Sequence, residues 1–581
     1  MAKPLMSAHR PGVWLAAILV LAFLLVSLVL PLGRIVFTAF QTADGQLTLA
    51  HFQAFFTHAL MQEAFANSLC VAALSALLAA LIAMPLAYLT ARFEFRGALL
   101  IQALGVLPLL MPPFVGALAM QQIFGRSGAV NLLLDRHFGF TLPLMDGLGG
   151  VVFVETLHYF PFILMNLTAA LRTIDGSLEE AAMNLGCHGW RLFWRIIFPL
   201  ALPGFVAGAS LVFVKVFDDL GTPLVLGQTN LLAPQAYLRI TETGLDDPQG
   251  QVISVIMIVF SIAAMALSAR ALKGRHFSLQ QKGSGGLQRR RLSPPGTWAA
   301  QGWVLLVLLL VLSPHLGVLL LSAADIWSYA PLPDGYTFSH YLTAFKDARD
   351  MMGNTLLYCS LAAGLDVVLG LMIAWLSLRT RLPGRQWLDW IATVPLAVPG
   401  VVLAIAYLRF FRDTPLPGGS ELLTSSWLLI MLAYAVRRLP YALRSCVAAL
   451  QQLDPSLEEA AYSVGATPAR TLRRVMLPLM AGGILAGLIT SFVTAAVELS
   501  ATLTLISADA QAPVSYGIYL SMQSASGRGP GAALGVLSIL MVAVGTWLSH
   551  RIAKSSLTGS LTGSLSGSLS GSLSGRHGGT S

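Results

Sequence analysis

Long apolar runs separated by short polar segments dominate this chain. A helix rises about 1.5 Å per residue, so about 20 apolar residues cross the roughly 30 Å hydrocarbon layer of a bilayer. Twelve runs approach that length and predict twelve transmembrane helices. They cover residues 14–32, 68–89, 99–124, 151–171, 201–226, 252–272, 303–321, 356–378, 387–410, 427–450, 479–506 and 532–548. The pattern therefore predicts an all-α polytopic membrane protein.

The composition agrees with a membrane protein. Of the 581 residues, 56% are hydrophobic and 11% are charged, whereas about 25% of residues are charged in an average soluble domain. This balance excludes a wholly disordered, collagenous or secreted disulfide-rich chain. The cysteines form no Cys-x-x-Cys pair and the histidines form no ligand cluster by spacing, so we expect reduced thiols, no metal site and no bound cofactor. These residues include Cys70, Cys187, Cys359, Cys446, His51, His158, His315 and His340.

The basic residues predict the topology. If the N-terminus is cytoplasmic, 24 of the 36 Lys and Arg lie in cytoplasmic segments and nine lie on the opposite side. The positive-inside rule then favours a cytoplasmic location for both termini. We read the first apolar run as a retained anchor rather than a signal peptide. The net charge of +9 is spread over loops rather than along one stripe, so we expect no nucleic-acid partner.

The chain is a tandem duplication of six spans. Asn-Ser-Leu at 67–69 recurs as Asn-Thr-Leu at 354–356, 287 positions later, and the offset becomes 279 after the third span of each half. Pro108 and Pro112 recur as Pro395 and Pro399. Because six is even, both halves have the same orientation, and we expect parallel repeats with a path between them.

This duplication predicts four regions. The first six-span module covers 1–272 and the second covers 303–554. Between them, 273–302 is rich in Gly, Gln, Ser, Lys and Arg and predicts a flexible cytoplasmic linker. Residues 555–581 repeat Ser-Leu-Thr-Gly or Ser-Leu-Ser-Gly, which predicts a disordered tail.

Each half carries the same cytoplasmic loop, near 175–200 and 454–479. The first reads Leu-Glu-Glu-Ala-Ala-Met-Asn-Leu-Gly over 178–186, then nine residues, then Ile-Ile-Phe-Pro. The second reads Leu-Glu-Glu-Ala-Ala-Tyr-Ser-Val-Gly over 457–465, then nine residues, then Val-Met-Leu-Pro. Ser177 and Ser456 are expected N-caps of a short helix. Gly186 and Gly465 then allow a turn into a second, basic amphipathic helix.

A loop lying on anionic lipid would explain the arginines of this segment, Arg191, Arg195, Arg470, Arg473 and Arg474. It would not explain two copies with the same spacing. The loops instead resemble the EAA loop of permeases in binding-protein-dependent ABC importers: Glu-Ala-Ala, three residues, Gly, nine residues, Ile, any residue, Leu, Pro. Phe198 replaces the Leu of that pattern and Val475 replaces its Ile, both by apolar residues.

The resemblance implies a fused, two-module permease of the type I fold. It implies that the loop is a coupling helix for a separate cytoplasmic ATPase, because this chain has no P-loop motif of its own. The expected partners are two ATPase copies, which use the ATP, one periplasmic binding protein, and the lipid of the inner (plasma) membrane. The chain itself is expected not to be an enzyme. The residues that carry the coupling by resemblance are Glu180, Ala181, Gly186, Glu459, Ala460 and Gly465.

Acidic residues within spans are costly and often functional. Asp219 and Glu498 occupy equivalent positions, 279 residues apart, and Asp218 precedes the first. One interpretation is that these acids line the translocation path and favour a cation. The alternative is that they pair with Lys215, Arg437 or Arg438 and hold helices together, or lie at the outer water interface.

The segments around Asp219 and Glu498 also resemble those of fused ferric-iron permeases, in a group that includes thiamine and 2-aminoethylphosphonate permeases. Ferric iron is therefore the expected cargo, with those two solutes as alternatives. An ion-coupled secondary transporter with parallel six-span repeats would share the span count but would not need paired loops. A polytopic membrane enzyme would need catalytic motifs such as His-Glu-x-x-His or Gly-x-Ser-x-Gly, which the sequence lacks.

Overall fold

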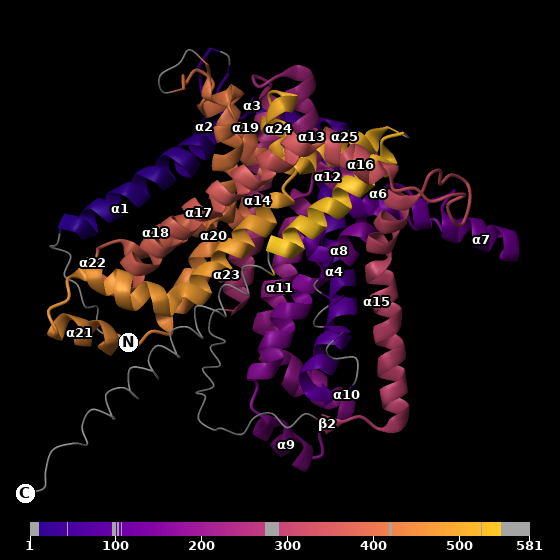
Figure 1. The fold of residues 1–581 in the computed structure, drawn as a ribbon, viewed down its shortest axis with the longest axis horizontal. Helices are drawn as coiled ribbons and strands as arrows, with labels where there is room; N and C mark the ends of the chain where they lie inside the picture. The colour runs from indigo at the N-terminus through magenta and orange to yellow at the C-terminus, as the bar shows by residue number, and fades with distance from the viewer. Residues whose placement is uncertain are drawn as a thin grey trace, which may run out of the picture.

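The structure is a computed structural model that describes residues 11–42, 44–95, 100–101, 104–105, 107–272, 290–416, 421–524, 526–545 and 547. Figure 1 shows a helical molecule whose long helices run side by side in two groups. The predicted tail at 555–581 lies outside the described residues, and so do residues 273–289 of the predicted linker.

Within the described ranges, nine helices are long and apolar enough to cross a membrane, and one bent pair of helices could form a tenth span. The chain is therefore an all-α polytopic membrane protein, although the predicted count of twelve is not confirmed. The nine are Gly12–Ala39, Ala59–Arg92, Gly147–Thr173, Gly189–Asp218, Pro248–Ala271, Pro294–Ala323, Arg349–Arg379, Pro468–Ala496 and Arg528–Gly545.

Each half is built around three packed helices that correspond to each other in the duplication. In the first half these are α4 (Ala59–Arg92), α8 (Gly147–Thr173) and α11 (Phe198–Asp218). In the second half they are α17 (Arg349–Arg379), α20 (Trp427–Gln451) and α23 (Leu477–Ala496). Small residues at the contacts allow close approach, as at Gly208, where an added Cβ would lie 2.7 Å from the Ile163 Cα.

Further helices and two short strands surround and connect these six helices. In the first half they are α1 (Pro11–Leu24), η1 (Leu25–Val29), α2 (Leu30–Ala39), α3 (Ala50–Thr57), β1 (Phe93–Glu94), η2 (Leu107–Leu110), α6 (Pro113–Phe124), α7 (Ala129–Phe138), α9 (Gly176–Asn184), α10 (Gly189–Leu192), η3 (Phe193–Ile197), α12 (Gly221–Val225), α13 (Leu232–Leu238), η4 (Arg239–Thr243) and α14 (Pro248–Leu272). In the second half they are β2 (Arg290–Arg291), α15 (Pro294–Ala323), α16 (Ser339–Asp347), α18 (Arg385–Thr393), η5 (Val394–Ala397), α19 (Gly400–Phe410), η6 (Leu423–Ser425), α21 (Ser456–Ser463), α22 (Pro468–Thr471), η7 (Leu472–Met476), α24 (Ser500–Leu505), η8 (Asp509–Gln511) and α25 (Val514–Gln523).

The first helix of each half packs on the other half. The continuous helix of α1, η1 and α2 lies against α17, α18 and α19 of the second half, where the Tyr407 hydroxyl donates to the Ser27 carbonyl at 2.6 Å. In return α15 packs on α6 of the first half. This exchange interlocks the halves. The β1 strand also pairs in parallel with β2, and α15 begins at Pro294, inside the segment predicted as linker.

Prolines break one predicted span in each half. The prediction of a single helix over 387–410 is wrong, because α18 with η5 meets α19 at a bend of 110°. Pro395 and Pro399 lie at this bend, and each lacks the N–H that a continuous helix needs. In the first half, Pro108 and Pro112 likewise lie in η2 and just before α6. Broken helices of this kind occur at membrane depth where protein surrounds the backbone.

The predicted span 427–450 does form a helix, α20. It carries Arg437 and Arg438 in its middle, both buried, and so differs from an ordinary apolar span. Such a helix is compatible with a membrane only if the protein itself satisfies the two guanidinium groups.

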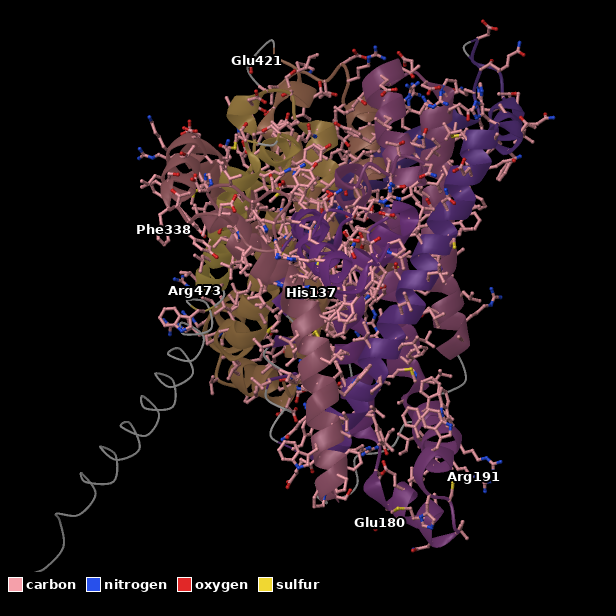
Figure 2. All side chains as sticks on the ribbon, turned by 90° about the vertical axis from the view of Figure 1, so that its right-hand side faces the viewer. His137, Glu180, Arg191, Phe338, Glu421 and Arg473 are labelled. Atoms are coloured by element: carbon pink, nitrogen blue, oxygen red, sulfur yellow. The ribbon has the colours of Figure 1, made fainter. Side chains whose placement is uncertain are left out.

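The two predicted loops lie away from most of the short connecting helices. In Figure 1, α9 and α10 lie at the bottom and α21 and α22 at the left, whereas α13, α24 and α25 lie toward the top. Figure 2 shows Glu180 and Arg191 at one end of the molecule and Glu421 at the opposite end.

Candidate coupling loops and central ion-pair network

Both loops form the predicted helical hairpin. α9 ends at Asn184 and α21 at Ser463, and two residues later Gly186 and Gly465 adopt φ of 82° and 81°. This left-handed conformation favours glycine. The Gly186 N–H donates to the Met183 carbonyl at 2.9 Å, and the Gly465 N–H donates to the Tyr462 carbonyl at the same distance. The predicted role of both glycines in the turn is confirmed.

The predicted N-caps, Ser177 and Ser456, are wrong, because each serine lies inside its helix. Asp175, not Ser177, caps α9, because its Oδ1 accepts the Ser177 N–H at 2.9 Å. Asp454 Oδ1 accepts the Ser456 N–H at the same distance. These hydrogen bonds lower the pKa of both exposed carboxyl groups. An aspartate therefore precedes each helix and binds an N–H of its first turn, which also suits the positive end of the helix dipole.

The second helix of each hairpin is continuous with a span. α10, η3 and α11 form one helix from Gly189 to Asp218, and α22, η7 and α23 form one from Pro468 to Ala496. The first contains 30 residues, which corresponds to about 45 Å. Each loop is thus joined rigidly to the helix that enters the centre of the molecule.

A buried ion pair fixes the inner side of each hairpin. Arg92 at the end of α4 lies 2.5 Å from Glu179, and Arg379 at the end of α17 lies 2.6 Å from Glu458. Arg379 also donates to the Leu450 and Leu453 carbonyls, at 3.1 and 2.9 Å, where α20 ends. Sequence reasoning missed these contacts. The signal was present, because both arginines and both glutamates recur at the offsets of the duplication.

The predicted coupling residues lie on the outer side of the same helices. All six are exposed: Glu180, Ala181, Gly186, Glu459, Ala460 and Gly465. The large apolar side chains beside the glycines are exposed too, with Leu185 at 88% and Val464 at 84% of their maximum. Each hairpin therefore has an anchored inner side and an exposed outer side that contains apolar groups.

A network of buried charges joins the halves at the centre. Asp218, the last residue of α11, lies 2.5 Å from Arg437 of α20, and Arg437 lies 2.5 Å from Glu498. Arg438 also pairs with Glu498. Asp218 and Glu498 therefore lie together, in the ion pairs that formed the alternative interpretation of these acids.

Asp219 has a different surrounding. Its Oδ2 accepts the Thr222 N–H at 2.8 Å and caps α12, while Glu498 Oε1 accepts the Ala501 N–H at 3.2 Å and caps α24. These two caps are equivalent in the duplication. They lie where α11 and α23 end, so the predicted spans 201–226 and 479–506 are each broken at the acid.

Gly400 makes room for the network. Its N–H donates to Asp218 Oδ1 at 2.7 Å. A Cβ at this position would lie 2.3 Å from Arg437 Nη1 and 3.0 Å from Glu498 Oε1. The start of α19 therefore contacts the ion pairs through its backbone, which a side chain would prevent.

Two of the four histidines considered as metal ligands, His51 and His340, contact backbone carbonyl groups. His51 Nε2 lies 3.0 Å from the Gln41 carbonyl, and His340 Nε2 lies 2.9 Å from the Ala324 carbonyl. In the part of the chain that the structure describes, no three His, Cys, Asp or Glu side chains gather as metal ligands.

Comparison with known proteins identifies the class. A sequence model described as "Binding-protein-dependent transport system inner membrane component" matches residues 83–275 and again 366–556. Together these segments cover more than half of the chain, which therefore belongs to this family. Both copies lie in one polypeptide, so the chain is a fused two-module permease of the ABC importer type.

Two relatives match most of the chain. The ferric transport system permease protein FbpB of Actinobacillus pleuropneumoniae is 28% identical over 463 residues, 78% of this chain and 65% of the relative. This chain therefore spans less than two thirds of that relative. The putative ferric transport system permease protein FbpB 1 of Haemophilus influenzae is 28% identical over 471 residues, 80% of this chain and 73% of the relative.

A shorter relative matches one half. The putative 2-aminoethylphosphonate transport system permease protein PhnU of Salmonella typhimurium is 32% identical over 265 residues, 44% of this chain and 91% of the relative. The family confirms the prediction of a multi-pass permease of the inner membrane that is not an enzyme. It excludes the alternative of an ion-coupled secondary transporter. The description of the family itself names dependence on a binding protein.

Proposed function

We propose that this permease carries ferric iron and that ATPase closure reaches its central path through α9 and α21. The observation that carries the proposal is the paired hairpin, exposed on one side and anchored by a buried ion pair on the other. The proposed coupling residues are Glu180, Ala181, Gly186, Glu459, Ala460 and Gly465.

The helix geometry supports transmission of a movement over a long distance. A displacement of the first hairpin moves the continuous helix Gly189–Asp218, whose far end is the Asp218 carboxylate. A displacement of the second hairpin moves Pro468–Ala496, which ends just before Glu498. A movement of either hairpin therefore reaches the same ion-pair network. We propose that this network closes the translocation path.

The partners follow from the two hairpins. We propose two ATPase copies, one for each hairpin, and one periplasmic binding protein, with ATP bound and hydrolysed in the ATPase and no cofactor in this chain. In this arrangement α9 and α21 face the cytoplasm, as do both termini. The permease modules comprise 1–272 and 303–554, joined by a cytoplasmic linker.

The cargo is inferred from the two ferric permeases, which match about 80% of the chain. A relative named for 2-aminoethylphosphonate matches 44% and supports that solute, with thiamine as a further alternative. In this proposal Asp218 and Glu498 close the path by pairing with Arg437 rather than by binding the cargo. Asp219 lies beside the path.

The coupling proposal is tested by reversing the two exposed glutamates. Purified permease is reconstituted with its ATPase and binding protein, and uptake is measured with ferric iron, thiamine and 2-aminoethylphosphonate in turn. The double variant Glu180→Lys with Glu459→Lys is expected to lose ATP-dependent uptake and ATPase capture. Glu421→Lys, exposed at the opposite end of the molecule, is the control for ATPase capture. Normal uptake by the double variant would contradict the coupling, whereas uptake of another solute would change only the cargo.

A further inference from the structure

Glu155 and Asp219 form a pair of carboxyl groups inside the first half. Glu155 lies in the middle of α8 and is fully buried, and the Asp219 carboxyl group adjoins it. The duplication places Tyr434 and Glu498 at the equivalent positions. Glu498 has two arginines as partners, whereas Asp219 has a second acid. The two equivalent acids therefore have opposite surroundings, since Asp219 faces a second acid and Glu498 faces two arginines.

The Glu155 carboxyl group is buried without a hydrogen-bond donor in standard geometry. Both Glu155 oxygens and the Thr222 hydroxyl are buried, and no described group meets them in standard hydrogen-bond geometry. Thr222 nevertheless lies beside both carboxyl groups. Two ionised carboxylates present only acceptors to each other and repel, at a depth where burying each charge is costly. One proton on either group turns this repulsion into a hydrogen bond between them.

Among the described residues, no cation acts directly on the pair. The cations of this region, Lys215 on α11 and Arg437 and Arg438 on α20, act on Asp218 and Glu498, and Arg438 also acts on Asp366 of α17. Glu155 and Asp219 instead have each other, Thr222 and the acid Glu498 as neighbours. The other titratable groups nearby are Tyr159 and Tyr441, with His158 facing His315. A low-dielectric interior therefore favours one proton on the pair over two unpaired negative charges.

We propose that Glu155 and Asp219 form a proton-binding site in the first half and share one proton near neutral pH. The Thr222 N–H donates to Asp219 Oδ2. The Thr222 hydroxyl lies beside both carboxyl groups, and in this proposal it donates to the carboxyl oxygen that the shared proton leaves unsatisfied. Glu498, the equivalent of Asp219 in the second half, needs no such proton, because it pairs with Arg437 and Arg438.

Infrared spectroscopy of the purified full chain tests the site without any transport assay. A protonated carboxyl group has a C=O stretching band, separate from that of a carboxylate, that shifts in heavy water. We expect the wild-type minus Glu155→Gln difference spectrum near neutral pH to show the loss of one such band. No difference would mean that Glu155 is ionised, and it would overturn the proposal.

Sharing is tested by a second variant. In Asp219→Asn the band is expected to shift, because its hydrogen-bond partner has changed from a carboxyl group to an amide. An unchanged band would show that Glu155 holds its proton alone and would contradict a shared site. The matched control is Asp366→Asn, a buried acid of α17 whose partner is the Ser491 hydroxyl. It is expected to leave the Glu155 band in place. The wild-type band, lost at strongly alkaline pH, provides evidence that does not depend on any variant folding.

Discussion

Asp218 of the first half and Arg437 of the second half lie 2.5 Å apart, although 219 residues separate them in the chain. Both side chains are almost completely buried, so in this state the pair is shielded from water. Because the pair joins the two halves, we propose that opening of the path between them separates it. This relationship makes the network a gate in the proposed cycle.

Removing the Asp218 charge is expected to destabilise the closed state. In Asp218→Asn, Arg437 keeps Glu498 but loses its charged partner across the halves, so we expect a cost below the roughly 3–5 kcal/mol of leaving a buried charge wholly unpaired. The apparent midpoint of thermal unfolding in detergent measures the effect. A midpoint equal to that of the wild type would show that the pair does not hold the halves together.

Gly400→Ala tests the space beside the same pair. The added Cβ would displace the Arg437 guanidinium, since 2.3 Å is far below contact distance. We expect a lower unfolding midpoint than for the wild type. Gly364→Ala in α17 is the control, because no atom lies within 4 Å of its Cβ and alanine favours a helix by about 1 kcal/mol. Equal destabilisation by both variants would contradict the steric argument.

The buried anchor of α21 predicts a local effect. Glu458→Gln leaves Arg379 without its charged partner, and a loss of about 3 kcal/mol corresponds to roughly 100-fold faster local opening. Hydrogen exchange of the α21 amides measures this opening. The exposed neighbour Glu459→Gln is the control and is expected to leave exchange unchanged. Similar exchange in both variants would show that the ion pair does not order the hairpin.

The exposed Asp246 carboxyl group, which pairs with Arg409 and Arg412, predicts a small dependence of folding stability on pH. Hydrogen bonds from Arg412 and Arg409 hold the pKa of the Asp246 carboxyl below its usual range. A depressed pKa stabilises the fold above the unfolded pKa of aspartate, and this contribution is lost as pH falls through the folded value. Because the side chain is 68% exposed, solvent screening keeps the contribution below about 1 kcal/mol.

Unfolding midpoints of the wild type and Asp246→Asn across the acid range measure this contribution. We expect the wild type to be slightly more stable near neutral pH and the difference to vanish in acid. A difference that grows as pH falls would have the wrong sign for a depressed pKa.

The sequence pattern within single segments predicts some of these structural features but not others. The left-handed turns at Gly186 and Gly465 follow from a glycine after a short helix, so the sequence predicts them correctly. The repeat offsets aligned Asp219 with Glu498, and both do cap equivalent short helices. The contact across the halves belongs instead to the neighbouring Asp218, which has no acidic counterpart in the second half. Such a contact depends on how the halves pack, which periodicity does not contain.

The bend at Pro395 and Pro399 shows the same limit in a span. The apolar content of 387–410 alone predicts a single helix, because membrane helices tolerate proline. Two prolines four residues apart, repeated in both halves, were a sign of the break. The anchors Arg92 and Arg379 were similarly visible as repeated residues, but their pairing with Glu179 and Glu458 required the three-dimensional structure.

The most direct test of the coupling is the distance between the two hairpins. Spin labels on Leu185→Cys and Val464→Cys report it, since both positions are exposed beside the proposed ATPase surfaces; the exposed Cys70 and the partly exposed Cys187 are replaced beforehand. In the assembled importer, trapping the ATPase in its closed state is expected to shorten the distance between the labels. An unchanged distance, in a complex that hydrolyses ATP and transports its cargo, would contradict transmission through α9 and α21.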